Sequence, residues 1–224
     1  MMKQYFKIKE QNKDSILFFR LGDFYEMFSD DAKIASKELE LTLTGRDCGQ
    51  AERAPMCGVP FHSCEGYIAR LVAKGYKVAI CEQTEDPATA KGLVKRDIIR
   101  VITPGTVMES SMLDEGRNNY ICCMFSDSKK IGLCFCDIST GELYATEISG
   151  SDSVNSLTSQ LASYNPREIL IGGDIVKIKS LPAFIKSKLS AGVEMLRDES
   201  FDNKLCTDTV NMQFGEEMQC IADS

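Results

Sequence analysis

Several features that mark common classes of protein are missing from this 224-residue chain. It has no tryptophan, and no apolar run approaches the roughly 18 residues of a membrane-spanning helix. The segment Met1–Lys7 has no apolar core behind its positive charges, so no signal peptide is expected. The single histidine, His62, has no recognisable nucleophile set against it, so no catalytic residue is predicted. The chain is expected to be cytoplasmic, with no membrane partner.

The ten cysteines match the spacing of neither a disulfide framework nor a zinc site. No Cys-x-x-Cys pair occurs, and His62 is the one histidine available as a nitrogen ligand. Cys122 and Cys123 are adjacent, and Cys134 and Cys136 alternate within a strand-like segment. In a cytosolic chain such thiols are best read as small, reduced apolar residues, so no metal site is predicted.

The charge of the chain is negative overall but unevenly distributed. It carries 26 Lys and Arg residues against 33 Asp and Glu, a net charge of −7. Residues 1–103 are nearly neutral, with 16 basic against 15 acidic residues, so the excess of acid lies in the remainder. The first half is therefore better suited to nucleic acid. A basic run there fits phosphate contacts or a solvated strand face equally well; it consists of Lys91, Lys95, Arg96 and Arg100.

Hydrophobic periodicity predicts a mixed α/β arrangement in the first half. Strands are expected at residues 15–21, 41–44, 78–81 and 98–102. A helix is expected from Phe24 to Leu39, where apolar residues recur every three or four positions. A second helix is expected around 67–72, ended by Gly75. The segment Pro55–His62 is read as a loop because Gly and Pro interrupt it.

The second half changes to closely spaced strands. Three strands joined by tight turns are predicted, followed by alternating helices and strands. The expected strands are 120–125, 131–138, 142–148, 168–173 and 193–196, and the expected helices are 154–163 and 181–189. This order of elements is that of the ribonuclease-H-like fold. Thr103–Thr106 is the predicted joint, which gives domains at 1–106 and 107–224.

Two stretches of the sequence raise catalytic alternatives. Gly173–Ser180 is the nearest match to the phosphate-binding loop, but Ile178 replaces its second glycine, so no nucleotide site is predicted. A ribonuclease-H-like domain raises the alternative of a metal-dependent nuclease, with Asp127, Asp137 and Glu142 as available carboxylates. Asp127 and Glu142 fall in predicted turns, which disfavours the nuclease, and fold alone does not give function.

The segment Gly22–Phe28 places an aromatic ring and a carboxylate two residues apart, in Phe24 and Glu26. This pair is unusual for a nucleic-acid contact, because phosphates repel a carboxylate. The segment also has a structural reading, since Asp23 followed by Glu26 fits a capping box at the start of the predicted helix. On these residues alone, the helix start is the more economical interpretation.

Six short motifs together resemble the N-terminal region of the MutS family of bacterial DNA mismatch-recognition proteins. They are Leu21–Phe28, Asp30–Lys33, Pro55–His62, Ala79–Gln83, Asp86–Ala88 and Arg100–Thr106. They occur in the family's order and spacing across roughly residues 1–106. The remainder resembles the family's connector domain more loosely, mainly through Asp137–Glu142. The resemblance implies an α/β chain, with a mixed-sheet mismatch-recognition domain followed by a ribonuclease-H-like connector.

The same resemblance implies roles for particular residues. Phe24 is expected to enter the minor groove and stack on a mispaired or unpaired base. Glu26 is expected to hydrogen-bond that base, and nearby phosphates favour its protonated, donating form. Met56, Phe61 and His62 are expected to support this wedge or to touch the DNA backbone.

The resemblance also implies properties of the whole protein. The family's lever, clamp and ATPase domains would lie beyond residue 224, so the chain is expected to be an N-terminal fragment without catalytic activity. The full-length protein is expected to be a homodimer that binds ATP and Mg²⁺ and recruits the partner MutL through the connector. Tyr25 is expected to pack inside rather than to touch DNA. A MutS relative that serves recombination is a further alternative, which the presence of Phe24 and Glu26 disfavours.

Overall fold

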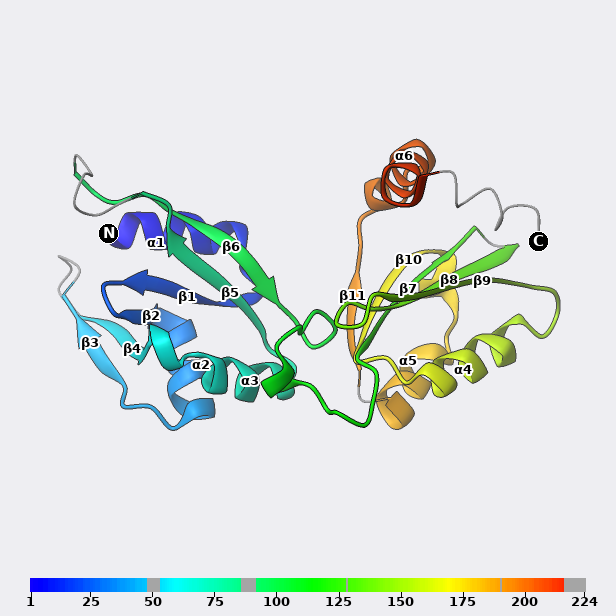
Figure 1. Cartoon of the computed structure of the whole chain (residues 1–224). Helices are drawn as coiled ribbons and strands as arrows, with labels where there is room; N and C mark the ends of the chain where they lie inside the picture. The colour runs from blue at the N-terminus through cyan, green and yellow to red at the C-terminus, as the bar shows by residue number, and fades with distance from the viewer. Residues whose placement is uncertain (48–52, 86–91, 128, 190, 216–224) are drawn as a thin grey trace. The chain divides into compact units, whose positions relative to one another are not determined.

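The computed structural model describes residues 1–47, 53–85, 92–127, 129–189 and 191–215. The chain folds as two compact units, Met1–Asn118 and Asn119–Ser224 (Figure 1). The predicted joint at Thr103–Thr106 lies within unit 1, where the Thr106 hydroxyl accepts a hydrogen bond from the backbone N–H of Thr103 at 2.9 Å. Val107, just beyond this turn, is buried in the core of unit 1. Cys48, Lys91 and the motif at 86–88 lie outside the described residues.

Unit 1 is built on a six-stranded mixed sheet in the order β3-β4-β2-β1-β5-β6. Its strands are β1 (Ser15–Leu21), β2 (Phe24–Phe28), β3 (Thr44–Arg46), β4 (Ala54–Pro60), β5 (Lys77–Gln83) and β6 (Arg96–Ile102). Its helices are α1 (Met2–Gln11), α2 (Ser29–Leu39) and α3 (Glu65–Ala73), with short 3₁₀ turns η1 (Phe61–Ser63) and η2 (Ser110–Met112). β1 and β5 pair in parallel, and the other neighbours pair antiparallel.

Helices lie on both faces of this sheet, with α1 on one side and α2 and α3 on the other (Figure 1). Aromatic rings pack between α1 and the sheet. The ring centroids of Tyr5, from α1, and Phe28, from β2, are 4.9 Å apart. Asp31 of α2 holds α1 to the sheet. Its carboxylate accepts hydrogen bonds from the Tyr5 hydroxyl at 2.9 Å and the Leu17 backbone N–H at 3.0 Å, and it pairs with Lys9 Nζ at 2.9 Å. The motif Asp30–Lys33 therefore contains a buried anchor of unit 1.

Unit 2 contains a five-stranded mixed sheet in the order β11-β10-β7-β8-β9. Its strands are β7 (Tyr120–Ser126), β8 (Lys130–Asp137), β9 (Glu142–Ser149), β10 (Glu168–Gly173) and β11 (Gly192–Met195). Its helical segments are α4 (Ser153–Tyr164), η3 (Asp174–Lys177), α5 (Leu181–Phe184), the π-helical turn η4 (Ile185–Leu189), η5 (Asp198–Phe201) and α6 (Asn203–Phe214). Three antiparallel strands are followed by two parallel ones, β10 beside β7 and β11 beside β10. The predicted ribonuclease-H-like order is thus confirmed.

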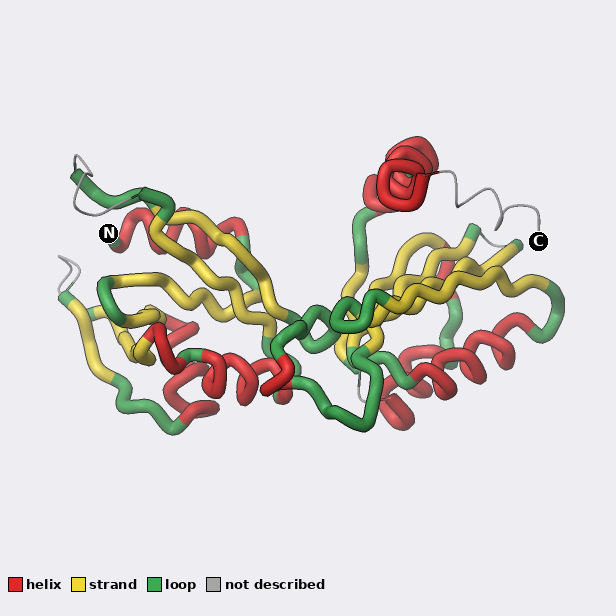
Figure 2. Tube along the Cα trace, viewed as in Figure 1, coloured by secondary structure: helices red, strands yellow, loops and turns green. Residues whose placement is uncertain are grey.

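One face of the second sheet carries α4 and α5, and the core of unit 2 lies between them and the strands (Figure 2). The motif Asp137–Glu142 forms the turn between β8 and β9. Asp137 is 1% exposed, and its carboxylate accepts hydrogen bonds from Ser139 Oγ at 2.6 Å and from the backbone N–H groups of Ser139 and Asn119 at 2.9 Å. These bonds hold the pKa of Asp137 below its usual value, although burial alone would raise it.

The prediction of a helix from Phe24 is wrong in its first five residues. Phe24–Phe28 is a strand that pairs with β1 on one side and β4 on the other, and the helix begins at Ser29. The predicted capping box between Asp23 and Glu26 is also wrong, because α2 starts after Phe28 without a side-chain cap. Pairing on both edges outweighed the helical spacing of the apolar residues, which a strand buried on both faces can also produce.

Other segments differ from the sequence prediction in smaller ways. The predicted loop Pro55–His62 is mostly the strand β4, whose Pro60 pairs with Phe24. The strand expected at 41–44 begins only at Thr44. The helix expected at 181–189 is α-helical to Phe184 and continues as a π-helical turn. The helices α1 and α6 were not predicted.

Candidate nucleic-acid interface

The most exposed part of the Leu21–Phe28 motif is a tight hairpin that ends in an aromatic ring. Leu21 and Phe24 are paired across the hairpin, which leaves Gly22 and Asp23 as its two turn residues. Gly22 has φ of +58°, a conformation that a side chain disfavours and that this class of two-residue turn requires. The Phe24 side chain is 47% exposed at the first position of β2. A large apolar ring is therefore presented on a short, paired segment.

Phe24 and Glu26 lie on the same face of the sheet, because successive side chains of a strand alternate between faces. Between them, Tyr25 points to the opposite face, where it is buried in the core with α2 and α3. The prediction that Tyr25 packs inside is thus confirmed. In a helix, residues two apart point in nearly opposite directions, so the strand is what brings the ring and the carboxylate to one surface.

Glu26 forms an ion pair with Arg46 at the end of β3. Arg46 Nη1 lies 2.5 Å from Glu26 Oε2, and the side chains of Glu26 and Arg46 are 18% and 39% exposed. On β4 the residue opposite Glu26 is Gly58. A Cβ at Gly58 would lie 3.5 Å from Glu26 Cγ and 3.2 Å from the Tyr25 carbonyl oxygen, so glycine leaves room for the Glu26 side chain.

Two of the three other predicted site residues lie at the same end of the sheet as Phe24. Phe61 and His62 follow Pro60, the partner of Phe24, and the Phe61 backbone N–H donates to the Asp23 carbonyl at 2.9 Å. Both side chains are exposed, and their rings meet edge to face with centroids 5.8 Å apart. The residues that sequence reasoning grouped around Phe24 are therefore partly brought together.

Met56 does not share that location. It pairs with Phe28, four residues along β2 from Phe24, and packs against the core beneath α1. Four residues of strand correspond to about 13 Å. This geometry therefore does not favour a direct role of Met56 in supporting the Phe24 ring.

A braced group of side chains lies beneath the hairpin on the opposite face. The Arg20 guanidinium sits 3.4 Å from the centre of the Phe61 ring, and Arg20 Nε donates to the Gly22 carbonyl at 2.6 Å. Glu82 of β5 accepts hydrogen bonds from Arg20 and from the Tyr25 hydroxyl. Burial, reinforced by the bond to Glu82, raises the pKa of Tyr25, which keeps its hydroxyl a donor. The brace ties the hairpin turn, Phe61 and β5 together.

The two arginines of the basic run, Arg96 and Arg100, lie on β6 but are not simply solvated. Arg96 Nε donates to the Arg20 carbonyl at 2.7 Å, and its Nη1 donates to the Val94 carbonyl at 3.0 Å. Burial lowers the pKa of Arg96. Arg100 pairs with Glu109 and donates to the Thr106 carbonyl at 3.2 Å. Arg96 and Arg100 thus make internal contacts in unit 1.

Several cysteines are held as thiols. Burial raises the pKa of the core residues Cys57 and Cys81 to about 11 and about 12, and that of the partly buried Cys123 to about 11. Within the described residues, no group of three or more His, Cys, Asp or Glu side chains is arranged to hold a metal ion. In the same part of the chain, no helix combines the length and the apolar run needed to cross a bilayer.

The carboxylates considered for a nuclease serve structural contacts. Asp127 accepts hydrogen bonds from the backbone N–H groups of Lys129 and Lys130 at 3.1 and 3.0 Å. Asp137 is occupied in its turn, and Glu142 accepts from the Tyr120 hydroxyl at 3.1 Å. This arrangement offers no support for the nuclease alternative.

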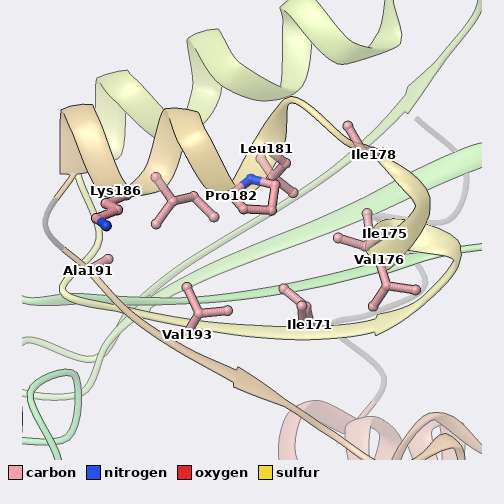
Figure 3. A pocket seen from close by; sticks show the side chains of 10 residues that line it. Ile171, Ile175, Val176, Ile178, Leu181, Pro182, Lys186, Ala191 and Val193 are labelled. Atoms are coloured by element: carbon pink, nitrogen blue, oxygen red, sulfur yellow. The ribbon is translucent and has the colours of Figure 1, made fainter.

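Unit 2 also contains an apolar pocket of about 450 Å³ between β10, η3, α5 and β11 (Figure 3). Its lining consists of aliphatic side chains and Pro182, with Lys186 as the charged residue. None of these lining side chains is a carboxylate or an imidazole, so the lining provides no usual protein ligand for a metal ion.

The sequence did not single out Arg46, which lies beside Glu26, or Arg20, which lies beneath the hairpin on the opposite face. Arg46 is 20 residues from its partner Glu26, and Arg20 is 41 residues from Phe61. In the sequence, Arg46 is marked only by its place two residues beyond the alternating segment 41–44, and Arg20 only by its place just before the Gly22 turn. Neither signal identifies a partner without the pairing of the strands.

Comparisons with known proteins show the family to which the two units are similar. Residues 1–111 match the family model described as MutS domain I, and residues 119–219 match MutS domain II. The chain is 51% identical over 214 residues to DNA mismatch repair protein MutS of Acetivibrio thermocellus, covering 96% of this chain and 25% of that protein. It is 55% identical over 202 residues to the protein of the same name from Ruminiclostridium cellulolyticum, covering 90% and 23%. The chain therefore spans about a quarter of the length of these relatives.

Proposed function

The chain belongs to the MutS family of DNA mismatch repair proteins, and we propose that its first unit recognises mispaired and unpaired bases in duplex DNA. The observation that carries this proposal is the surface shared by Phe24 and Glu26. A half-exposed aromatic ring and a carboxylate lie on one face of a paired strand, next to a hairpin turn that is braced from below.

In this proposal Phe24 is the wedge. Inserting a ring into the minor groove separates two stacked bases, which costs a few kcal/mol, and the resulting kink lets the duplex contact more protein. A mispaired step is already weakened, so the same deformation costs less there than in matched DNA. The hairpin supports this role because Phe24 is fixed by strand pairing to Leu21 and Pro60 and needs little ordering on binding.

Glu26 contributes to selectivity for mismatched DNA rather than to overall binding affinity. A displaced base offers hydrogen-bonding groups that a protonated carboxyl can bind, and phosphates nearby favour protonation. In matched DNA that bond cannot form, and the carboxylate then opposes binding through its charge. The position of Glu26 on the same face as Phe24 supports this division of roles.

The remaining properties of the whole protein are extrapolated from its family. We infer an ATP-dependent mismatch sensor that works as a cytoplasmic homodimer and recruits MutL through unit 2. ATP and Mg²⁺ would be held by parts of the protein outside this chain, and we assign no catalytic step to the two units described. Phe61 and His62 are candidates for contacts with the DNA backbone beside the wedge.

A competition assay on the full-length protein tests the proposal. Wild type, Phe24→Ala and Phe6→Ala are compared for binding to mismatched and matched duplexes at one stated salt concentration. Phe6 is the matched control, because it lies in unit 1 and its side chain is also 47% exposed. Base–aromatic stacking is worth about 1–3 kcal/mol per base, so Phe24→Ala should weaken mismatch binding by roughly 5- to 150-fold.

Phe6→Ala should retain the wild-type preference. Glu26→Gln should change the ratio of the two affinities more than it changes either affinity alone. Equal binding of the two duplexes by wild type, or an unchanged preference in Phe24→Ala, would refute the proposed function.

A further inference from the structure

The Glu26 carboxylate is not an isolated charge in this structure, because Arg46 neutralises it. Glu26 is the less exposed partner, at 18%, whereas Arg46 lies at the end of the edge strand β3 and is 39% exposed. The proposed selectivity relies on a carboxylate that opposes matched DNA and binds a displaced base. The ion pair with Arg46 changes both the repulsion of matched DNA and the bond to the displaced base.

We propose that Arg46 is a positioning residue that limits the preference of this surface for mismatched DNA by holding the Glu26 carboxylate in an ion pair. This inference rests on the proposed function and concerns the same site. Arg46 acts through Glu26 and needs no contact with a base.

On matched DNA, the pair reduces the penalty that Glu26 imposes. An ion pair has no net charge, so phosphates repel it less than they repel a bare carboxylate at the same place. The guanidinium adds an attraction to the backbone that does not depend on base sequence. Arg46 therefore makes matched DNA easier to bind than Glu26 alone would allow.

On mismatched DNA, the same pair competes with the base. Glu26 must leave the Arg46 guanidinium before its carboxyl group can bond a displaced base, so the lost ion pair is subtracted from that bond. Gly58 opposite Glu26 leaves space around the Glu26 side chain, which makes such a change of partner sterically possible. Both effects reduce the ratio of mismatched to matched affinity.

The size of the effect follows from the exposure of the pair. Partly exposed ion pairs contribute little, so removing Arg46 should raise the affinity ratio by only about two- to fivefold. The overall affinity for both duplexes should fall, because a phosphate-attracting charge is lost. A preference that rises while affinity falls is not the result of simple damage to the fold.

The test is a double-mutant cycle in the full-length protein, with Arg46→Gln, Glu26→Gln and the double variant. Mismatched and matched duplexes are competed at one salt concentration. Arg46→Gln should raise the affinity ratio in the wild-type background and leave it unchanged in the Glu26→Gln background. Arg53→Gln, which removes an exposed arginine from the hairpin between β3 and β4, should lower both affinities without changing the ratio.

Arg46→Lys gives a second check, because it keeps a cation near Glu26 while removing the planar guanidinium. Its affinity ratio should return toward that of wild type. The inference is overturned if Arg46→Gln leaves the ratio unchanged or lowers it, or if the ratio rises equally when Glu26 is already Gln. Wild type and Phe24→Ala are measured in parallel, so a failure of the mismatch preference itself is recognised separately from a failure of the role of Arg46.

Discussion

Asp137→Asn should destabilise unit 2 markedly, although it replaces a carboxylate by a side chain of the same shape. The Asp137 carboxylate is 1% exposed and accepts hydrogen bonds from Ser139 Oγ and from the backbone N–H groups of Ser139 and Asn119. An asparagine accepts through one oxygen only, and its amide group would face a donor. The loss of at least one charge-assisted bond, with a buried donor left unsatisfied, costs about 2–4 kcal/mol.

A urea titration of the chain, followed by NMR amide signals that separate unit 2 from unit 1, measures this loss. With a slope of about 2 kcal/mol per molar urea, the midpoint of unit 2 should fall by about 1–2 M. Unit 1 should keep its midpoint. Glu147→Gln is the control, because it removes an exposed carboxylate paired with Lys130 from the same sheet and should leave the midpoint nearly unchanged.

The effect of Asp137→Asn should also depend on pH in one direction. The hydrogen bonds lower the pKa of Asp137 in the folded chain, so the charged carboxylate stabilises the fold at pH values above its usual pKa. That contribution is lost as pH falls through the depressed value. The difference between wild type and Asp137→Asn should therefore be full from pH 5 to 7 and shrink below about pH 4. Equal stabilities at pH 7, or an equal difference at pH 3 and pH 7, would contradict this reasoning.

Two further substitutions test the packing of the units. Asp31→Asn should cost unit 1 about 2–4 kcal/mol in urea unfolding, because it breaks a buried ion pair with Lys9 and weakens the bond that holds α1. Gly173→Ala should destabilise unit 2 by more than Gly150→Ala. Both glycines have positive φ, but their surroundings differ. A Cβ added at Gly173 would lie 2.3 Å from the Ser126 carbonyl oxygen, whereas a Cβ added at Gly150 would meet no heavy atom within 4 Å.

The sequence predicted best those strands that are bounded by turn residues. β1, at Ser15–Leu21, was predicted to the residue, and the five strands of unit 2 were predicted to within two residues. The helix α1 was missed because it buries two side chains, Tyr5 and Ile8, which are too few to give a clear periodic pattern. The helix α6 was missed because it buries no side chain that would give a pattern.

The candidate site was predicted in composition but not in geometry. Phe24 and Glu26 were singled out from the residue types and the family resemblance, whereas their shared face depends on β2 being a strand. That strand is fixed by pairing with β1 and β4, and β4 lies some 30 residues further along the chain. The Glu26–Arg46 contact depends on the same long-range pairing. Local periodicity contains no information about either partner.

The strand explains why the ring and the carboxylate are separated by one residue. In an α-helix each residue turns by 100°, so Phe24 and Glu26 would point about 200° apart and could not meet one base. In a strand they point the same way, and Tyr25 between them is free to anchor the opposite face through Glu82. A one-residue insertion between Phe24 and Glu26 would turn the carboxylate toward the core formed with α2 and α3. The spacing therefore joins the two requirements of the site, since one strand both holds the hairpin to the sheet and presents its wedge and its selective group on one surface.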